Sequence, residues 1–366
     1  MTSQAASTAA APNAPLPAAS LPTASLPAAR PLTAVLLVQL GTPDAPEPTA
    51  VRRYLAEFLS DPRVVEIPRA AWWPILHGFV LRTRPQASAQ RYRQIWSTDG
   101  SPLLTISQRQ ASLLRGTLGE QGFDVSVALA MRYGQPSIPD VLAELQQRRL
   151  ARLLVVPMYP QFAAATTATV FDALAATFNG WRDLPDLRFV RGFHDHGRWL
   201  DALAASIRRH WEREGRGDRL VMSFHGLPQR AVDRGDPYEH ECRATADALA
   251  RRLGLRSDAW VVAFQSRLGR ARWLEPATEP TLEALARAGV ATVDVVFPGF
   301  VADNLETLEE IAIGGREAFV KAGGKGLRTI ACVNDSPDFI AALADLVAGQ
   351  LGGWPCRRAD RPAAGR

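Results

Sequence analysis

Eight short apolar runs, separated by longer amphipathic stretches, constrain what this chain can fold into from residue 32 onward. They cover residues 34–40, 125–131, 153–158, 187–190, 220–224, 260–264, 292–297 and 329–333. Helical patterns lie between them, including residues 51–59, 107–118, 138–147, 200–212, 245–253, 282–288, 305–322 and 338–351. Strands that are apolar on both faces and alternate with helices indicate parallel sheets covered on both sides. The pattern predicts an α/β protein with two doubly wound, parallel-sheet domains.

The two ends of the chain differ in composition from its middle. Residues 1–30 are rich in Ala and Pro, and Arg30 is their only charged residue, so they cannot bury enough apolar surface to offset the entropy of ordering. We expect a disordered Ala/Pro-rich tail at 1–30 and a flexible tail at 353–366. Turn-forming residues near 176–186 favour a boundary between domains at 31–180 and 181–352.

Charge and cysteine usage argue against several classes of protein. The formal net charge is +5, but no basic tract concentrates it as a nucleic-acid-binding arm would, so no nucleic-acid partner is expected. No apolar run approaches the roughly 18–20 residues that span a bilayer. Cys242, Cys332 and Cys356 lie far apart without metal-ligand spacing, which favours a reducing, cytoplasmic setting. No G-x-G-x-x-G follows the first strand, and neither a P-loop nor a G-x-S-x-G elbow occurs.

One histidine directly follows an apolar run that is expected to form a strand. In open parallel sheets, ligands bind beyond the carboxyl ends of the strands, and His225 with Gly226 occupies that position after residues 220–224. His225 is therefore a candidate for chemistry, although an isolated histidine at a strand end is also a common structural residue. The histidines at positions 194, 196 and 210 are interpreted as surface residues.

Acidic residues follow a second run of the same half. The spacing of Asp303, Glu306 and Glu310 predicts one helical face of hard oxygen donors suited to a divalent cation, while an N-terminal cap is the competing interpretation. Because both runs are expected in one parallel sheet, His225 and Glu306 should face a single cleft. One nitrogen and a carboxylate form a sparse donor set that would hold a metal without trapping it.

Seven ordered segments resemble those of the ferrochelatases of bacterial type, the protoporphyrin (haem) ferro-lyases. They are LVQLGTP at 37–43, YRQIWSTDGSPL at 92–103, MRYGQP at 131–136, PMYPQF at 157–162, SFHGLPQRAVDRGDPY at 223–238, FQSRLGRARWLEP at 264–276 and PGFVADNLETLEEI at 298–311. The resemblance covers residues 33 to about 350. It implies two Rossmann-like, chelatase-like domains and a lyase of haem and porphyrin biosynthesis. That enzyme inserts Fe²⁺ into protoporphyrin IX, forming protohaem and releasing two protons.

The resemblance also assigns roles to particular residues. His225 and Glu306 correspond to the catalytic, metal-binding pair, and Asp303 and Glu310 extend its acidic track. The residues expected to bind the porphyrin are Tyr92, Ser101, Arg132, Tyr133 and Trp273. A neutral imidazole, with an unperturbed pKa of about 6.5, can accept a pyrrole proton at cellular pH. The sequence leaves open whether His225 primarily accepts that proton or delivers the metal.

Residues 67–85 resemble the family's mobile lip over the active site. Trp72 and Trp73 lie there among several arginines, a combination that suits the surface of an anionic membrane. We expect peripheral attachment to the inner membrane face, with the two tryptophans as ordinary core residues under a loop as the alternative.

Two departures from the family pattern affect the expected cofactors and contacts. Some relatives carry a [2Fe-2S] cluster on four cysteines, but this chain has three, so no cluster is expected and iron is needed only as substrate. Alanines occupy positions 163–165, where relatives often place serines and a cysteine. The remaining alternatives are a chelatase for another metal or porphyrin, such as coproporphyrin III or sirohydrochlorin, and a non-catalytic haem-binding or haem-transfer protein.

Overall fold

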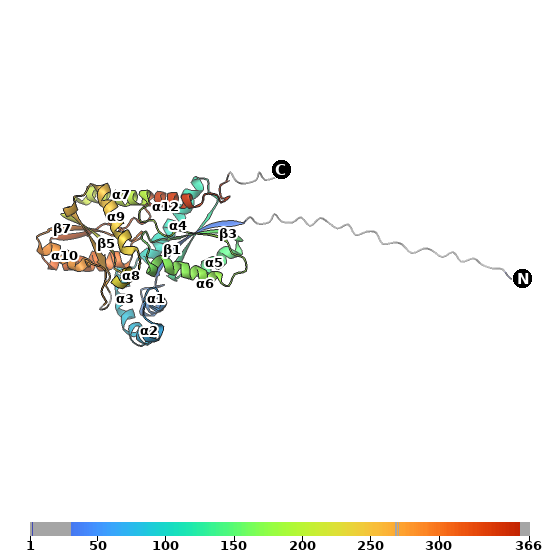
Figure 1. Ribbon diagram of the computed structural model, residues 1–366, viewed down its shortest axis with the longest axis horizontal. Coiled ribbons are helices and arrows are strands. Elements are labelled where there is room, and N and C mark those ends of the chain that lie inside the picture. Colours follow the sequence, from blue (N-terminus) through green and yellow to red (C-terminus); the bar gives the residue numbers. More distant parts are fainter. Residues whose placement is uncertain (1, 3–30, 268, 270, 359–366) are drawn as a thin grey trace. The chain divides into compact units, whose positions relative to one another are not determined.

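Two four-stranded parallel sheets organise the structure, a computed structural model that describes residues 2, 31–267, 269 and 271–358 (Figure 1). The first sheet has the order β2-β1-β3-β4, with strands β1 (Leu32–Thr42), β2 (Ser126–Gly134), β3 (Leu150–Pro157) and β4 (Asp186–Phe189). The second has the order β6-β5-β7-β8, with strands β5 (Arg219–His225), β6 (Trp260–Gln265), β7 (Thr292–Val296) and β8 (Gly326–Thr329). The predicted α/β fold with two parallel sheets is confirmed.

Helices connect the strands and cover the sheets. Those of the first half are α1 (Pro48–Ser60), α2 (Arg69–Ile75), the π-helix η1 (Leu76–Val80), α3 (Leu81–Ile95), α4 (Pro102–Glu120), α5 (Ile138–Gln147), the π-helix η2 (Ala164–Ala168) and α6 (Thr169–Phe178). Those of the second half are α7 (Gly197–Glu214), α8 (Gln229–Asp233), α9 (Tyr238–Leu253), the 3₁₀ turn η3 (Ser257–Ala259), α10 (Thr278–Arg287), the π-helix η4 (Glu306–Gly315), α11 (Arg316–Lys321) and α12 (Pro337–Gln350). None of the helices in the described part of the chain is long and apolar enough to cross a membrane.

A single apolar core joins one face of both sheets. It includes Leu37 on β1 and Met222 on β5, both fully buried, together with Trp199 on α7 and Leu343 on α12. Helix α12 packs against α7 and also against α4 of the first half. The carboxyl edges of the two sheets are therefore held at fixed positions within one compact unit from residue 31 onward.

The change from the first sheet to the second lies later than the predicted boundary between residues 180 and 181. Strand β4 pairs with β3, with Asp186 opposite Arg152, so the first sheet continues to Phe189. The turn near 176–186 connects a helix to a strand of the same sheet, and turn chemistry does not distinguish that connection from one between domains.

The predicted strand at 329–333 is also displaced. Strand β8 ends at Thr329, and the Ile330 amide still donates to the Val295 carbonyl at 2.8 Å. Beyond it the chain leaves the ladder, although Cys332 and Val333 stay buried. A short apolar run indicates that its residues are buried but does not determine their secondary structure. In this case the buried residues lie in a loop rather than in a strand.

The described part of the predicted flexible C-terminal tail is packed, contrary to expectation. Trp354 is 6% exposed and its indole nitrogen donates to Asp186 Oδ2 at 2.7 Å. The Arg188 guanidinium lies 4.2 Å from the centre of the Trp354 ring, and Cys356 is buried in the core. A large aromatic side chain shortly after α12 explains the docking. The predictions for residues 1–30 (apart from Thr2) and for 359–366 fall outside the described residues.

One of the three histidines interpreted as surface residues is buried. His210, on α7, is 9% exposed, and its Nε2 lies 4.0 Å from Asp294 Oδ1 on β7. Asp294 is fully enclosed and accepts hydrogen bonds from the Trp211 indole and the Arg328 guanidinium. His194 and His196 are half-buried.

Candidate active site

His225 lies at the carboxyl end of β5, where the sequence predicts it, although the strand ends on His225 itself rather than at residue 224, and the residue is exposed. Its Nδ1 lies 2.7 Å from the Gly226 carbonyl oxygen, and the Tyr238 hydroxyl donates to the His225 carbonyl at 3.0 Å. A carbonyl oxygen can only accept, so in the neutral imidazole the proton is on Nδ1 and Nε2 keeps its lone pair. That nitrogen is the one available to a proton or a metal.

Gly226 allows the chain to turn tightly just after His225. A Cβ atom at this position would lie 2.5 Å from the Gln265 carbonyl oxygen and 3.2 Å from the Trp273 ring. The Gly226 amide donates to that same carbonyl at 2.7 Å. The glycine therefore brings β5, the end of β6 and Trp273 into contact, and it places the predicted porphyrin-binding Trp273 beside the histidine.

Glu306, the first residue of η4, lies within electrostatic reach of His225 although 81 residues separate them in sequence. Burial raises the pKa of the Glu306 carboxyl, and the charges of Glu310 and Glu309 raise it further, while His225 acts in the opposite direction. The structure thus brings the predicted pair together at the carboxyl edge of the second sheet, as expected for residues that follow β5 and β7.

Asp303 does not extend the acidic track. It precedes the helix instead of sharing a face with Glu306, and it is 7% exposed. Its carboxylate accepts from the Thr307 hydroxyl at 3.0 Å, the Cys332 amide at 3.2 Å and the Asn334 amide nitrogen at 2.7 Å. These bonds make Asp303 a structural residue that fixes the loop beside β8. It does not cap the helix, because the Thr307 amide donates to Asn304 Oδ1 at 3.1 Å instead. Among the described residues, no three His, Cys, Asp or Glu side chains are arranged to hold a metal ion.

The other acids of η4 remain close to Glu306. Both oxygens of Glu310 accept hydrogen bonds from Ser266, and Glu309 lies 3.6 Å from the Arg91 guanidinium on α3. Burial raises the pKa of Glu309, Arg91 lowers it, and Glu310 raises it. Glu309 was not identified from the sequence, although its spacing of three residues from Glu306 is also that of neighbours on a helix.

Buried tyrosines of the first half of the chain lie near Glu306. Tyr92 is 9% exposed, and burial followed by the negative charge of Glu306 raises its pKa. Tyr54, on α1, has its pKa raised by burial and by interactions with Tyr92, Glu306, Tyr159 and Tyr133. Tyr54 and Tyr159 were not predicted as site residues, because only their tertiary position distinguishes them from ordinary core aromatics. The predicted Ser101 is buried and accepts from the Thr42 hydroxyl at 2.9 Å.

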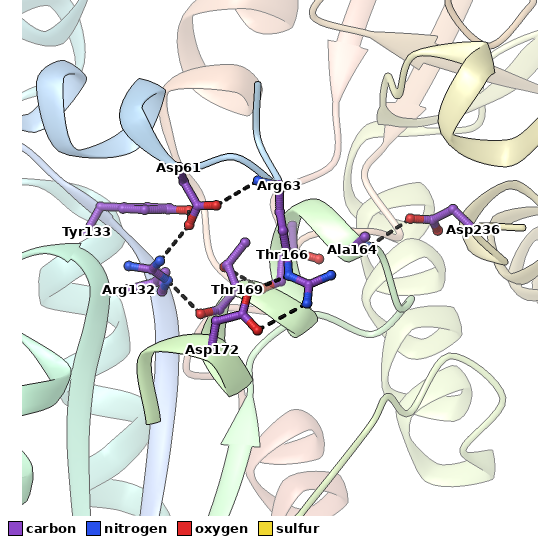
Figure 2. A network of polar contacts seen from close by, with 9 residues as sticks. All are labelled: Asp61, Arg63, Arg132, Tyr133, Ala164, Thr166, Thr169, Asp172 and Asp236. Carbon is purple, nitrogen blue, oxygen red and sulfur yellow. Dashed lines mark hydrogen bonds and ion pairs between the residues drawn. The ribbon is translucent and has the colours of Figure 1, made fainter. Parts of the chain in front are cut away.

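Arg132 and Tyr133 already have partners within the protein. Figure 2 shows both side chains directed at Asp61, which accepts from Arg132 at 2.5 Å and from the Tyr133 hydroxyl at 2.9 Å. Arg132 also donates to the Thr169 carbonyl at 2.8 Å. Asp61, at the end of α1, was not identified from the sequence. This network anchors the segment that leads into the lip, and an incoming carboxylate would have to compete with Asp61 for Arg132.

Comparison with known proteins identifies the family of this chain. The family model for ferrochelatase matches residues 32–351. The ferrochelatase of Bordetella pertussis is 57% identical over 321 residues, covering 88% of this chain and 89% of its own. That of Aromatoleum aromaticum is 56% identical over 323 residues and 88% of each chain.

Solved structures of low sequence identity share the fold. SirB from Bacillus subtilis, solved with Fe³⁺, has a TM-score of 0.53 at 13% identity, covering 88% of this chain and 96% of its own. DR2241 from Deinococcus radiodurans has a TM-score of 0.51 at 15% identity, covering 87% of this chain and 55% of its own. The extent of the family match and the identity to the curated relatives make this chain a member of the ferrochelatase family.

Proposed function

We propose that the protein inserts Fe²⁺ into protoporphyrin IX, the terminal step of haem biosynthesis, and that His225 and Glu306 carry out the reaction. The observation that carries the assignment is the meeting of these two side chains at one sheet edge, in a chain that matches the ferrochelatase family over residues 32–351. The reaction replaces two pyrrole N–H bonds by bonds to iron and releases two protons.

The geometry supports a division of roles between the two residues. The Nδ1–H of His225 is held by the Gly226 carbonyl, so the lone pair of Nε2 is presented to the substrate as a base. Glu306, whose pKa is raised by burial, accepts a proton more readily than an ordinary glutamate and offers an oxygen ligand to iron on its way in.

The surrounding side chains fit an apolar, dicarboxylic macrocycle. Tyr92 lies near Glu306 and Trp273 lies beside Gly226, so both can pack against an apolar ring. Arg132 can bind a propionate if its hydrogen bond to Asp61 is broken. Rates with protoporphyrin IX and coproporphyrin III, measured side by side, determine which porphyrin is preferred. Sirohydrochlorin with Fe²⁺ or Co²⁺ tests the alternative chelatase activities in the same assay.

The central test is anaerobic incubation with protoporphyrin IX and Fe²⁺, following the loss of porphyrin fluorescence. His225→Ala should lower the rate by about 10²–10⁴-fold, the range for removal of a general base. His240→Ala, at an exposed position on α9, is the matched control and should keep the wild-type rate. An unchanged rate in His225→Ala would contradict the assigned role, and binding of haem without any insertion would favour a transfer protein.

The cysteines support iron as substrate only, without a resident cluster. Cys242 and Cys332 are buried, and burial raises the pKa of both thiols, which disfavours the thiolate that binds iron. Protein purified anaerobically should show no iron–sulfur absorption in the visible range and should be fully active. A cluster spectrum that is lost together with activity on chelation would contradict this proposal.

The lip has the properties of a membrane-attachment surface. Figure 1 shows α2 and α3 projecting from the sheets, and the lip carries apolar side chains that are 38–65% exposed, at Ile67, Trp73, Ile75 and Phe79. Arg69 on α2 and Arg82 and Arg84 on α3 are also exposed. Trp72 instead packs inward and donates to the Leu59 carbonyl at 2.7 Å, so the core alternative holds for one tryptophan of the two. We propose peripheral attachment through this surface to the cytoplasmic face of the inner membrane.

Vesicle sedimentation tests the attachment. The wild type should sediment with vesicles containing phosphatidylglycerol more than with pure phosphatidylcholine, because arginines attract anionic lipid. The double variant Trp73→Ser, Phe79→Ser should lose most of the binding while keeping the insertion rate. Val320→Ser, which removes an exposed apolar residue on α11, is the matched control. Equal sedimentation of all three proteins would contradict the proposal.

A further inference from the structure

Two residues at the end of β6, Gln265 and Ser266, connect the segment that carries His225 to the helix that carries Glu306. Gln265 is the register partner of His225, since β5 and β6 are paired there. Its carbonyl oxygen accepts from the Gly226 amide at 2.7 Å. The backbone next to His225 is therefore fixed against this residue.

The side chain of Gln265 reaches the helix. It is 2% exposed, and its Nε2 donates to the Glu306 carbonyl oxygen at 3.1 Å. Its Oε1 accepts from the Ser223 hydroxyl at 2.6 Å, and Ser223 in turn contacts the Thr278 hydroxyl at 2.8 Å. Both ends of the Gln265 amide are thus engaged and its orientation is determined, as expected for a buried amide.

Ser266 holds the same helix one turn further along. Its φ of 63° is in the left-handed region, which is unusual for a residue other than glycine. In that conformation its amide donates to Glu310 Oε1 at 2.7 Å and its hydroxyl to Oε2 at 2.6 Å. Strain of this kind persists where surrounding contacts over-determine it, and it is often found at functional sites.

We propose that Gln265 and Ser266 are positioning residues for iron delivery: together they hold the first turn of η4 so that the Glu306 carboxylate faces His225. This inference rests on the proposed function. Gln265 fixes the backbone of Glu306, and Ser266 fixes the side chain of Glu310, so the two acids keep a constant separation. Neither positioning residue needs to touch iron or porphyrin for this role.

The proposal predicts different effects on the KM values for the two substrates, Fe²⁺ and protoporphyrin IX. Releasing Glu310 lets its charge and the first turn of η4 move, which weakens the encounter with the cation. Tyr92 on α3, which is expected to contact the porphyrin, packs with Val51 of α1 and Ala89 of its own helix and is hydrogen-bonded to neither Gln265 nor Ser266. The KM for Fe²⁺ should therefore rise, while the KM for protoporphyrin IX should stay within about twofold of the wild-type value.

Ser266→Gly is the sharpest variant, because glycine adopts the left-handed conformation without strain and the substitution removes the hydroxymethyl side chain while keeping the backbone amide. Loss of one hydrogen bond to a charged group should raise the KM for Fe²⁺ by about tenfold. Ser266→Asn, which tolerates positive φ and restores a side-chain donor, should recover part of the loss. Gln265→Met, similar in shape without the amide, should mainly lower kcat, because Glu306 itself is released.

Arg149→Gly is the matched control. Arg149 also has a left-handed backbone, with φ of 61°, but it lies just before β3 at the opposite edge of the first sheet, and its replacement should leave both KM values unchanged. A Ser266→Gly protein with a wild-type melting temperature and an unchanged KM for Fe²⁺ would overturn the proposal, as would equal changes in both KM values. Failure of the proposed function itself is distinguishable, since the wild type would then insert no iron or His225→Ala would be fully active.

Discussion

Position 226 illustrates how little room the site leaves for a single added atom. A methyl group there would meet the Gln265 carbonyl oxygen at 2.5 Å, a backbone atom that cannot rotate away. Gly41 has the same property at the end of β1, because a Cβ would lie 1.7 Å from the Tyr133 carbonyl oxygen. Both glycines lie at strand exits, where the sequence shows a glycine but not the backbone that approaches it.

Gly226→Ala should reduce iron insertion strongly, because the substitution displaces His225 and Trp273 relative to β6. A misplacement of about 1 Å costs on the order of 10²-fold in rate. Gly116→Ala is the control, since nothing lies within 4 Å of a Cβ at that helical position, and it should stabilise α4 by roughly 0.5–1 kcal/mol. Steady-state insertion rates and melting temperatures of the two variants test both expectations, and a wild-type rate in Gly226→Ala would contradict the first.

The raised pKa of Glu306 predicts a pH dependence. Burial and the charges of Glu310 and Glu309 raise this pKa, so Glu306 becomes protonated at a higher pH than an ordinary glutamate. Because a protonated Glu306 can neither accept a proton nor bind iron as a carboxylate, the insertion rate should decline as the pH falls through this pKa. Glu310→Gln removes one of the raising charges, so its acid limb should move to lower pH, as measured by kcat/KM against pH. An acid limb that moves to higher pH would contradict the electrostatic explanation.

Among the secondary-structure elements, η4 and the segment after α12 differ most from expectation. The pattern at 305–322 predicts one α-helix, whereas the structure has a π-helix from Glu306 to Gly315 followed by α11. Within this π-helix, Glu306 lies close enough to Glu310 and Glu309 for their charges to raise its pKa. Binary patterning cannot distinguish the two helix types, because both bury one apolar face.

Removal of Trp354 tests the packing of the C-terminal segment. Trp354→Ala deletes a side chain that is 6% exposed, together with its bond to Asp186 and its contact with Arg188. We expect a loss of about 3 kcal/mol in the free energy of unfolding, measured by urea denaturation. Trp73→Ala, at a position 49% exposed on the lip, should have little effect. Equal stability of the two variants would mean that the segment is not docked in solution.

Across the whole molecule, the shared core and a few long-range hydrogen bonds hold the two sheets as one unit. The amide of Gln110, fully buried on α4, donates to the carbonyls of Val301 and Asn334 on the loops after β7 and β8. Tyr92 and Glu306, which come from different halves of the chain, therefore meet in a rigid arrangement. The site depends on the global fold, so loss of global stability should be accompanied by loss of activity.

Global stability should depend on pH through His210. Burial lowers the pKa of this imidazole more than the Asp294 charge raises it. In the unfolded chain His210 becomes protonated near the ordinary histidine pKa of about 6.5, whereas in the folded protein it becomes protonated only at a lower pH. Stability is therefore fully present above about pH 6.5 and falls as pH decreases below it. The melting temperature should fall between about pH 7.5 and 5.5, and His210→Gln should flatten that dependence. An unchanged slope in the variant would rule out His210 as the cause.

The sequence by itself determined the fold class, the two sheets and the position of His225 at a strand exit, because hydrophobic period and glycine placement are local properties of the chain. It also identified Glu306 after β7, through spacing and family resemblance. Only the tertiary structure decided that Asp303 is a structural residue, that Asp61 binds Arg132, and that Gln265 and Ser266 connect the histidine to the acidic helix. These relations join residues distant in sequence, and the hydrogen-bond partners of a buried polar group are determined by which elements pack together.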